Sequence, residues 1–180
     1  MDNSKDVNDG RTAQATGYKR HTLSLYVANK PGVLIRIALV FARRGYNIDS
    51  LVVSPSADPD FSSMNIVASG DQKTLDQILK QLNKLIDVVH ASDRTNDDVI
   101  HRELALMKIN CDEGARGEVL QLAKALDCDT VDLGVASVTI EVTGNTDKLD
   151  AVGRVFDRYG VLEMIRTGKV LMSRGETITS

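Results

Sequence analysis

The sequence has little of what marks three large classes of protein: excess positive charge, long apolar runs and aromatic side chains. Its 180 residues carry 22 Lys and Arg against 25 Asp and Glu, a formal net charge of -3. This balance provides no broad basic surface for a phosphate backbone or an anionic membrane. No apolar run approaches the roughly 20 residues that span a bilayer. We therefore expect a soluble protein that binds neither nucleic acid nor membrane.

Residues for metal binding and covalent chemistry are also scarce. The two cysteines, Cys111 and Cys128, do not form the paired spacing of a metal site. The histidines, His21, His90 and His101, are scattered, with no thiol or carboxylate at metal-ligand spacing. No nucleophile is paired with a base. We therefore expect no catalytic residue, metal or cofactor in this chain, and we expect the cysteines to be reduced and buried.

The start of the sequence is polar. Residues 1–17, MDNSKDVNDGRTAQATG, cannot bury enough apolar surface to offset their chain entropy. Secretory signals need an apolar core, and transit peptides are Arg-rich and poor in acids, so the segment matches neither. We predict a disordered tail over residues 1–19 and a cytoplasmic protein.

After this tail, the apolar pattern predicts the order strand, helix, strand, strand, helix, strand. Alternating apolar residues from Arg20 onwards predict a first strand with one buried face. A helix over 34–44 should end at Gly45, and Leu39 and Val40 lie off its core-facing stripe, which indicates a second contact, such as one with another subunit. The core-facing residues of the two helices are predicted to be Leu34, Ile37, Ala38, Phe41 and Ala42, then Leu75, Ile78, Leu79, Leu82, Leu85 and Ile86. The other strands are expected at 48–54, 64–68 and 88–92.

The same order of elements recurs in the second half of the chain. Polar residues over 93–102 predict a linker. We predict an α+β protein of two tandem ferredoxin-like βαββαβ domains, over 20–92 and 103–175, each with its helices on one face of an antiparallel sheet, and a short tail at 176–180. The second half has CDEGARGE where the first has ANKPGVL, so we expect the two domains to differ in function.

The stretch ANKPGVL places a Pro-Gly turn directly before the first helix. Backbone N–H groups at a helix start lack partners within the helix, and the helix dipole favours an anion there. We expect the N–H groups of Val33 and Leu34 to bind a carboxylate, because the loop lacks the Gly-rich pattern of phosphate sites. Asn29 adds an amide that can accept from an ammonium group or donate to a carboxylate. Together these groups can hold a zwitterion.

Asn47 lies at the other end of the same helix. At about 1.5 Å per residue, it is about 15 Å from Asn29 within one chain, which is too far for one small amino acid to bridge. If both asparagines contact one ligand, the second must come from another subunit related by a two-fold axis. A simpler interpretation is also open, because Pro-Gly before a helix and Asn after Gly are common turn residues.

The strings NKPGVL, RRGYNIDSLVVSP and DPDFSSMNIV resemble the N-terminal ACT domain of the regulatory (small) subunits of acetohydroxyacid synthase, also called acetolactate synthase. The resemblance continues through HRELALMKI, DKLDAV and MIRTGKVLMSRG, so that it covers residues 20 to about 175. It implies an N-terminal ACT domain and a C-terminal ACT-like domain that contacts and activates the catalytic (large) subunit. The chain would then regulate the biosynthesis of the branched-chain amino acids valine, leucine and isoleucine.

The resemblance also implies an effector site for valine, which would mediate feedback inhibition, at the interface of a homodimer whose sheets join edge to edge. The implied contacts are Asn29, Gly32, Val33 and Leu34 from one chain, and Asn47 and Ile48 from its mate. In this family the catalytic subunit carries thiamine diphosphate, magnesium and FAD, so none of these is expected here.

Two other functions remain open from the residues alone. A free-standing ACT-domain sensor of a different enzyme would need only the first loop. An RNA-binding module can have the same βαββαβ order, but its central strands should display stacking aromatics. Here the strand over 63–68 offers Met64, Asn65 and Ile66, and aromatics make up 4% of the chain, which argues against RNA binding.

Overall fold

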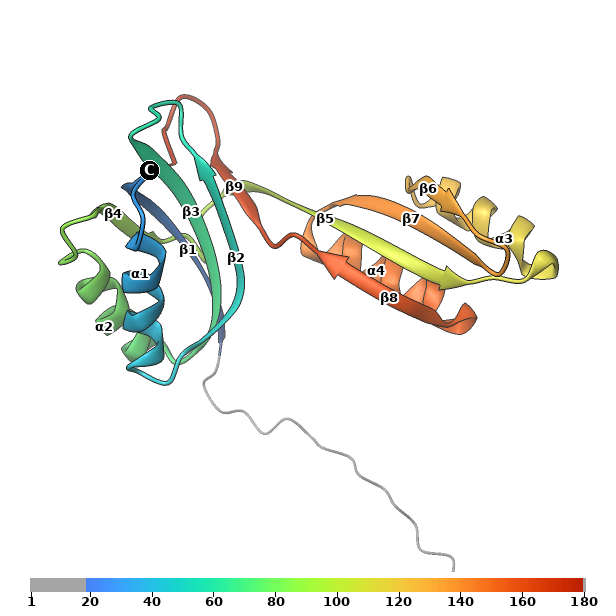
Figure 1. Ribbon diagram of the computed structural model, residues 1–180, viewed down its shortest axis with the longest axis horizontal. Helices are drawn as coiled ribbons and strands as arrows, with labels where there is room; N and C mark the ends of the chain where they lie inside the picture. The colour runs from blue at the N-terminus through green and yellow to red at the C-terminus, as the bar shows by residue number, and fades with distance from the viewer. Residues whose placement is uncertain (1–18, 180) are drawn as a thin grey trace, which may run out of the picture.

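The computed structural model describes residues 19–179, which form two units that follow each other along the chain (Figure 1). The predicted N-terminal tail lies outside the described residues, except for Lys19, which begins the first strand. No helix in the described part of the chain is long and apolar enough to cross a membrane.

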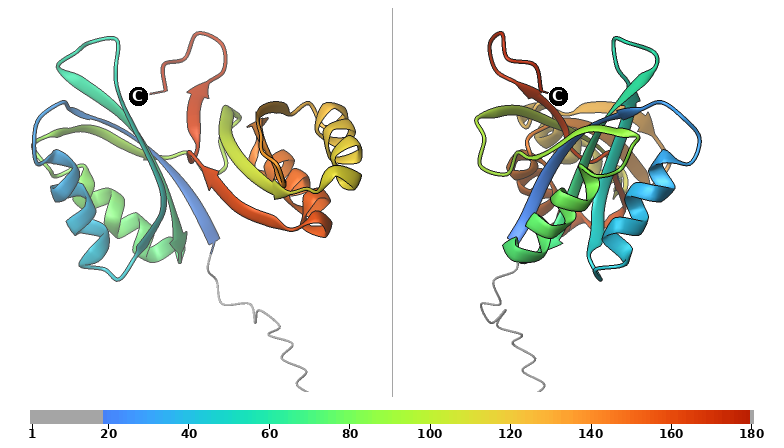
Figure 2. Two further views of the ribbon diagram at one scale, coloured as in Figure 1. Left: turned by 45° about the vertical axis from the view of Figure 1, so that its right-hand side comes forward. Right: turned by 90° about the vertical axis from the view of Figure 1, so that its left-hand side faces the viewer.

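The first unit is a four-stranded antiparallel sheet with both helices on one face, as predicted (Figures 1 and 2). The strands lie in the order β2-β3-β1-β4, so that β2 is at one edge. The elements are β1 (Lys19–Ala28), α1 (Val33–Ala42), β2 (Asn47–Pro55), β3 (Phe61–Gly70), α2 (Gln72–Leu82) and β4 (Val88–Asp93).

The core of this unit lies between the sheet and the two helices. Leu23 and Leu25 of β1, Ile37 of α1 and Ile78 of α2 are fully buried. Each such side chain contributes about 1.5–3 kcal/mol before chain entropy is subtracted. The core-facing side of α1 begins one residue earlier than predicted, because Val33 is 3% exposed.

Three predicted core residues, Leu34, Ala42 and Ile86, are exposed instead. Ala42 is the last residue of α1. Leu34 is 45% exposed, and its neighbour Val33 takes its place in the core. Ile86 is 98% exposed, because α2 ends at Leu82 and the helical period ends with it. Asn83 stabilises this end, since its side-chain amide exchanges two hydrogen bonds with the backbone of Ala91 in β4, at 2.9 Å each.

The second unit repeats the topology, with strand order β6-β7-β5-β8. Its core includes Met107, Val119 and Phe156, and both cysteines are buried in it as free thiols, as predicted. The elements are β5 (Val99–Asn110), α3 (Glu113–Ala125), β6 (Asp129–Leu133), β7 (Ser137–Gly144), α4 (Thr146–Phe156), the 3₁₀-helix η1 (Asp157–Tyr159), β8 (Val161–Arg166) and β9 (Val170–Ser173).

The structure differs from prediction between the two units. Residues 99–102, expected in a linker, are the first part of β5 and pair antiparallel with β9, from Val99 opposite Ser173 to Arg102 opposite Val170. Of the eight residues of this two-stranded ribbon, only Leu171 is buried, so its sequence has little of the alternation that marks a strand. The limits of independent domains at 20–92 and 103–175 remain a prediction.

Candidate effector-binding site

The start of α1 offers free backbone donors. Gly32 caps the helix in a left-handed conformation, φ 85° and ψ -10°, which a residue without a β-carbon adopts without strain. No side chain caps this end, and the first turn has no acidic residue. Within residues 19–179, the N–H groups of Leu34 and Ile35 have no acceptor, whereas that of Val33 makes a long bond of 3.4 Å to the Lys30 carbonyl. Of the two predicted donors, the Leu34 N–H is therefore free and the Val33 N–H is partly engaged. The free N–H of Ile35 was not predicted.

Asn29 lies in the loop just before this helix start. Its backbone N–H donates to the Asp60 carbonyl at 2.8 Å, and its side-chain Nδ2 donates to the Pro59 carbonyl at 3.0 Å. The loop between β2 and β3 therefore holds the Asn29 amide in one orientation. Its Oδ1 has no donor among the described residues and is left as an exposed acceptor.

Asn47 is the first residue of β2, at the opposite end of α1. The preceding Tyr46 is 8% exposed and donates its hydroxyl to the Asp71 carbonyl at 2.8 Å, which anchors this end of the strand. Asn47 Nδ2 donates to Asp49 Oδ1 at 3.2 Å, and the hydroxyl of Ser69 donates to the other oxygen of Asp49. Asn47 is exposed, and its Oδ1 has no donor among the described residues.

These groups have complementary polarity. The helix start offers N–H donors and a favourable dipole for a carboxylate, while each asparagine offers a carbonyl oxygen for an ammonium group. An α-amino acid carries both charges. A ligand with a carboxylate alone would leave both asparagine oxygens without a donor.

One chain does not bring all the predicted residues together. Asn29, Gly32, Val33 and Leu34 lie at the start of α1, whereas Asn47 and Ile48 follow its end. The 10 residues of this helix separate the two groups by about 15 Å.

The surface next to these residues suits association with a second chain. The strand β2 is a sheet edge, and an edge strand has unpaired backbone groups that can pair with another chain. Exposed apolar side chains lie beside it on α1: Leu34 is 45%, Ile35 66% and Leu39 45% exposed. Leu39 is thus available for the second contact predicted from its position, while Val40 packs partly against the core.

Two family models match the chain. One, described as the AHAS small subunit-like ACT domain, matches residues 23–90, and the other, described as the small subunit of acetolactate synthase, matches residues 102–175. The chain belongs to the acetolactate synthase small-subunit family. The acetolactate synthase small subunits of several bacteria resemble it along most of their length. That of Mycobacterium bovis is 43% identical over 157 residues, which are 87% of this chain and 94% of the relative.

Similarity to other members of the small-subunit family extends to archaea and to a solved structure. A probable acetolactate synthase small subunit of Archaeoglobus fulgidus is 44% identical over 156 residues, 87% of this chain and 98% of the relative. The crystal structure of the acetolactate synthase small subunit from Thermotoga maritima matches with a TM-score of 0.77 and 37% identity, covering 88% of this chain and 99% of that one. The fold of two tandem ACT-like units is therefore that of the small-subunit family.

Sequence reasoning missed the groups that orient the two asparagines. The Pro59 carbonyl is distant in sequence and gives no signal in the pattern. Asp49 could have been noticed, because it is two residues beyond Asn47 in a strand and so lies on the same face. Contrary to the expectation from residues 63–68, each central strand carries one aromatic, Tyr26 in β1 and Phe61 in β3. These two rings stack on each other with centroids 4.9 Å apart.

Proposed function

We propose that this chain is the regulatory subunit of an acetolactate synthase in branched-chain amino-acid biosynthesis. It binds valine between two copies of itself, mediates feedback inhibition and activates the catalytic subunit in the cytoplasm. The observation that carries this proposal is the polarity of the site: free N–H groups at the start of α1, and side-chain oxygens of the exposed residues Asn29 and Asn47 that have no donor among the described residues.

Within this proposal, the effector carboxylate binds the N–H groups of Leu34 and Ile35, and its ammonium group binds the Oδ1 atoms of Asn29 and of Asn47 of the second copy. Gly32, Val33 and Ile48 line the site. Hydrogen bonds to charged groups contribute about 1.5–3 kcal/mol each, so a few of them give moderate affinity. Moderate affinity suits a sensor whose ligand concentration varies around its Kd.

The two-fold symmetry of the proposed dimer follows from the edge strand. Two copies of β2 that pair antiparallel would join the two sheets, and this pairing is isologous. The exposed side chains of Ile35 and Leu39 on α1 would then be covered by the same residues of the second chain. Each dimer has two equivalent effector sites, each completed by Asn47 from the other copy.

We assign the contact with the catalytic subunit to residues 103–175. The face of this sheet opposite α3 and α4 carries Leu106, 38% exposed, and Ile165, 58% exposed, which are paired across β5 and β8. An exposed apolar face of this kind favours a protein partner. The partner, not this chain, would carry thiamine diphosphate, magnesium and FAD.

The test is reconstitution with the catalytic subunit, followed by titration with valine. We expect the two chains to co-purify, the acetolactate synthase activity to rise, and valine to inhibit the complex but not the catalytic subunit alone. A complex that valine does not inhibit, formed by an intact dimer, would count against the effector role. Capture of an unrelated enzyme instead would favour a free-standing sensor, the alternative that the first unit alone permits.

A further inference from the structure

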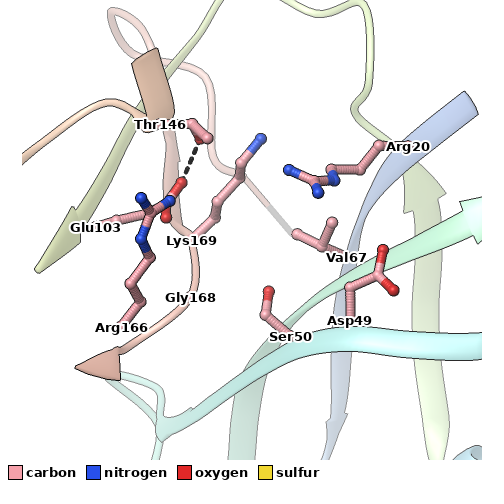
Figure 3. A pocket seen from close by; sticks show the side chains of 9 residues that line it. All are labelled: Arg20, Asp49, Ser50, Val67, Glu103, Thr146, Arg166, Gly168 and Lys169. Atoms are coloured by element: carbon pink, nitrogen blue, oxygen red, sulfur yellow. Dashed lines mark hydrogen bonds between the residues drawn. The ribbon is translucent and has the colours of Figure 1, made fainter. Parts of the chain in front are cut away.

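A β-bulge in β2 turns two neighbouring side chains towards the second unit. Ile48 pairs with Ala68 of β3 and Ser50 pairs with Val67, so Asp49 is an extra residue in the ladder. Such a bulge changes the direction of side chains along a strand. Asp49 and Ser50 therefore both line a pocket of about 210 Å³ at the junction of the two units (Figure 3).

The far wall of this pocket is formed by the loop between β8 and β9. Gly168, with φ +87°, lies so close to β2 that a β-carbon on it would be 3.0 Å from the side chain of Ser50 and 3.2 Å from that of Val52. Lys169 extends into the same pocket (Figure 3). The strand that carries Asn47 is thus in direct contact with the second unit.

Each wall of the pocket carries both signs of charge: Arg20 and Asp49 on the first unit, and Glu103, Arg166 and Lys169 on the second. Among the described residues, Lys169 and Arg20 make no ion pair, and Asp49 accepts only from Asn47 and Ser69. The other charges of the pocket have partners: Arg166 pairs with Asp150 at 2.6 Å, and buried Glu103 accepts from the hydroxyl of Thr146. Asp49 is therefore the acid that links the effector residue Asn47 to this junction.

We propose that Asp49 is a positioning residue for the effector, through which the second unit senses binding. In the arrangement seen here, Asp49 accepts from Nδ2 of Asn47 and leaves the Asn47 Oδ1 without a donor among the described residues. In the competing arrangement, Asp49 pairs with Lys169 across the junction and releases Asn47. An effector bound to Asn47 shifts the equilibrium towards the first arrangement. By linkage, any state that draws Asp49 to Lys169 lowers the affinity for the effector by the factor by which the effector disfavours that state. This inference rests on the proposed function.

The test is calorimetric titration of the full-length dimer with valine. We expect Asp49→Ala to raise the valine Kd about fivefold, because the Asn47 amide loses the acceptor that orients it. We expect Lys169→Gln to lower the Kd about twofold, because the competing partner is gone. In the double variant the Lys169→Gln effect should vanish, since both changes act through one carboxylate. A purely structural role for Asp49 predicts neither the opposite signs nor this loss of additivity.

Matched controls make the same chemical changes on exposed helix surfaces. Asp76→Ala on α2 and Lys124→Gln on α3 should leave the Kd unchanged. Asp49→Asn keeps an acceptor for Asn47 without the charge, so its valine Kd should be within about twofold of wild type. In this background the Lys169→Gln substitution should no longer change the Kd. This variant keeps the test decisive if Asp49→Ala unfolds. An unchanged Kd in Asp49→Ala, or a Lys169→Gln effect that persists without the carboxylate, overturns this inference alone. A wild-type dimer that binds no valine overturns the proposed function as well.

Discussion

Replacing Gly70 by alanine should release the side chain that anchors the start of β2. A β-carbon at Gly70 would lie 2.0 Å from Cζ, 2.2 Å from Cε2 and 2.3 Å from the hydroxyl of Tyr46. No two atoms can approach so closely, and the atoms concerned are the far end of one ring. Gly70→Ala therefore forces the Tyr46 ring out of its site.

The magnitude follows from what the ring loses. Tyr46 is 8% exposed, so its displacement returns most of an aromatic side chain to water, at about 1.5–3 kcal/mol. Its hydroxyl also gives up the hydrogen bond to the Asp71 carbonyl, which contributes about 0.5–1.5 kcal/mol. We expect Gly70→Ala to destabilise the first unit by about 2–4 kcal/mol, a large share of the 5–15 kcal/mol typical of a domain. Asn47, the next residue, should also be less well placed, so that the valine Kd rises.

The assay is urea unfolding followed by circular dichroism, with amide exchange in β1 reporting on the first unit. The matched control is Gly117→Ala in the interior of α3, where a β-carbon meets nothing within 4 Å and where we expect up to about 1 kcal/mol of stabilisation. In a Tyr46→Ala background, Gly70→Ala should cost little more. Stability within about 0.5 kcal/mol of wild type, or a full cost that persists without the ring, would refute this reasoning.

Further predictions concern the effector, the division of labour and the thiols. Asn29→Ala should raise the half-inhibiting valine concentration about tenfold in the reconstituted enzyme, because the ammonium group loses an acceptor and the Pro59 loop loses its anchor. Gly32→Asp should abolish valine inhibition but not activation, because it strains a backbone with φ 85° and places a carboxylate against that of the ligand. Loss of activation with an unchanged valine response would contradict this prediction. Truncation after Asp93 keeps the whole first core, so the product should bind valine in calorimetry and activate poorly; full activation would disprove the role of the second unit. Burial raises the pKa of the Cys128 thiol, so at pH 8 a smaller fraction of it is thiolate than in free cysteine. Alkylation of Cys128 should therefore be slower than that of free cysteine, and an equal rate would be evidence against burial.

The fold could be predicted because its signals are local. Alternation in β1 and the helical period of α2 each depend on neighbours along the chain, and Gly45, predicted to end the first helix, does adopt a positive φ of 66°. The predicted single buried face of β1 is wrong, because Thr22 and Ser24 on its other face are also buried. The errors lie where the context is tertiary. Ile86 continues the helical period in the sequence, but the hydrogen bonds of Asn83 to β4 end the helix first.

The candidate site could be predicted only in part. The Pro-Gly turn indicates an anion-binding helix start, because the donors belong to the backbone and depend on the turn alone. The direction of the Asn29 amide depends on the Pro59 carbonyl, which sequence spacing does not reveal. The partner of Asn47, Asp49, is only two residues away, but the bulge at Asp49 can be seen only with the partner strand. The need for a second chain follows from helix length, and it remains a prediction of the proposed dimer.

The ribbon of β9 with the start of β5 governs how the two halves of the molecule can move. Two hydrogen-bonded strands side by side resist bending within their plane, but a ribbon of only two strands twists more readily than a wide sheet. The junction should therefore allow twisting more readily than bending. The C-terminal half would then rotate about the axis of the ribbon, whereas a flexible loop would let it move in any direction. A small rotation at Gly168, close to that axis, would then become a large displacement at the distant edge formed by β6.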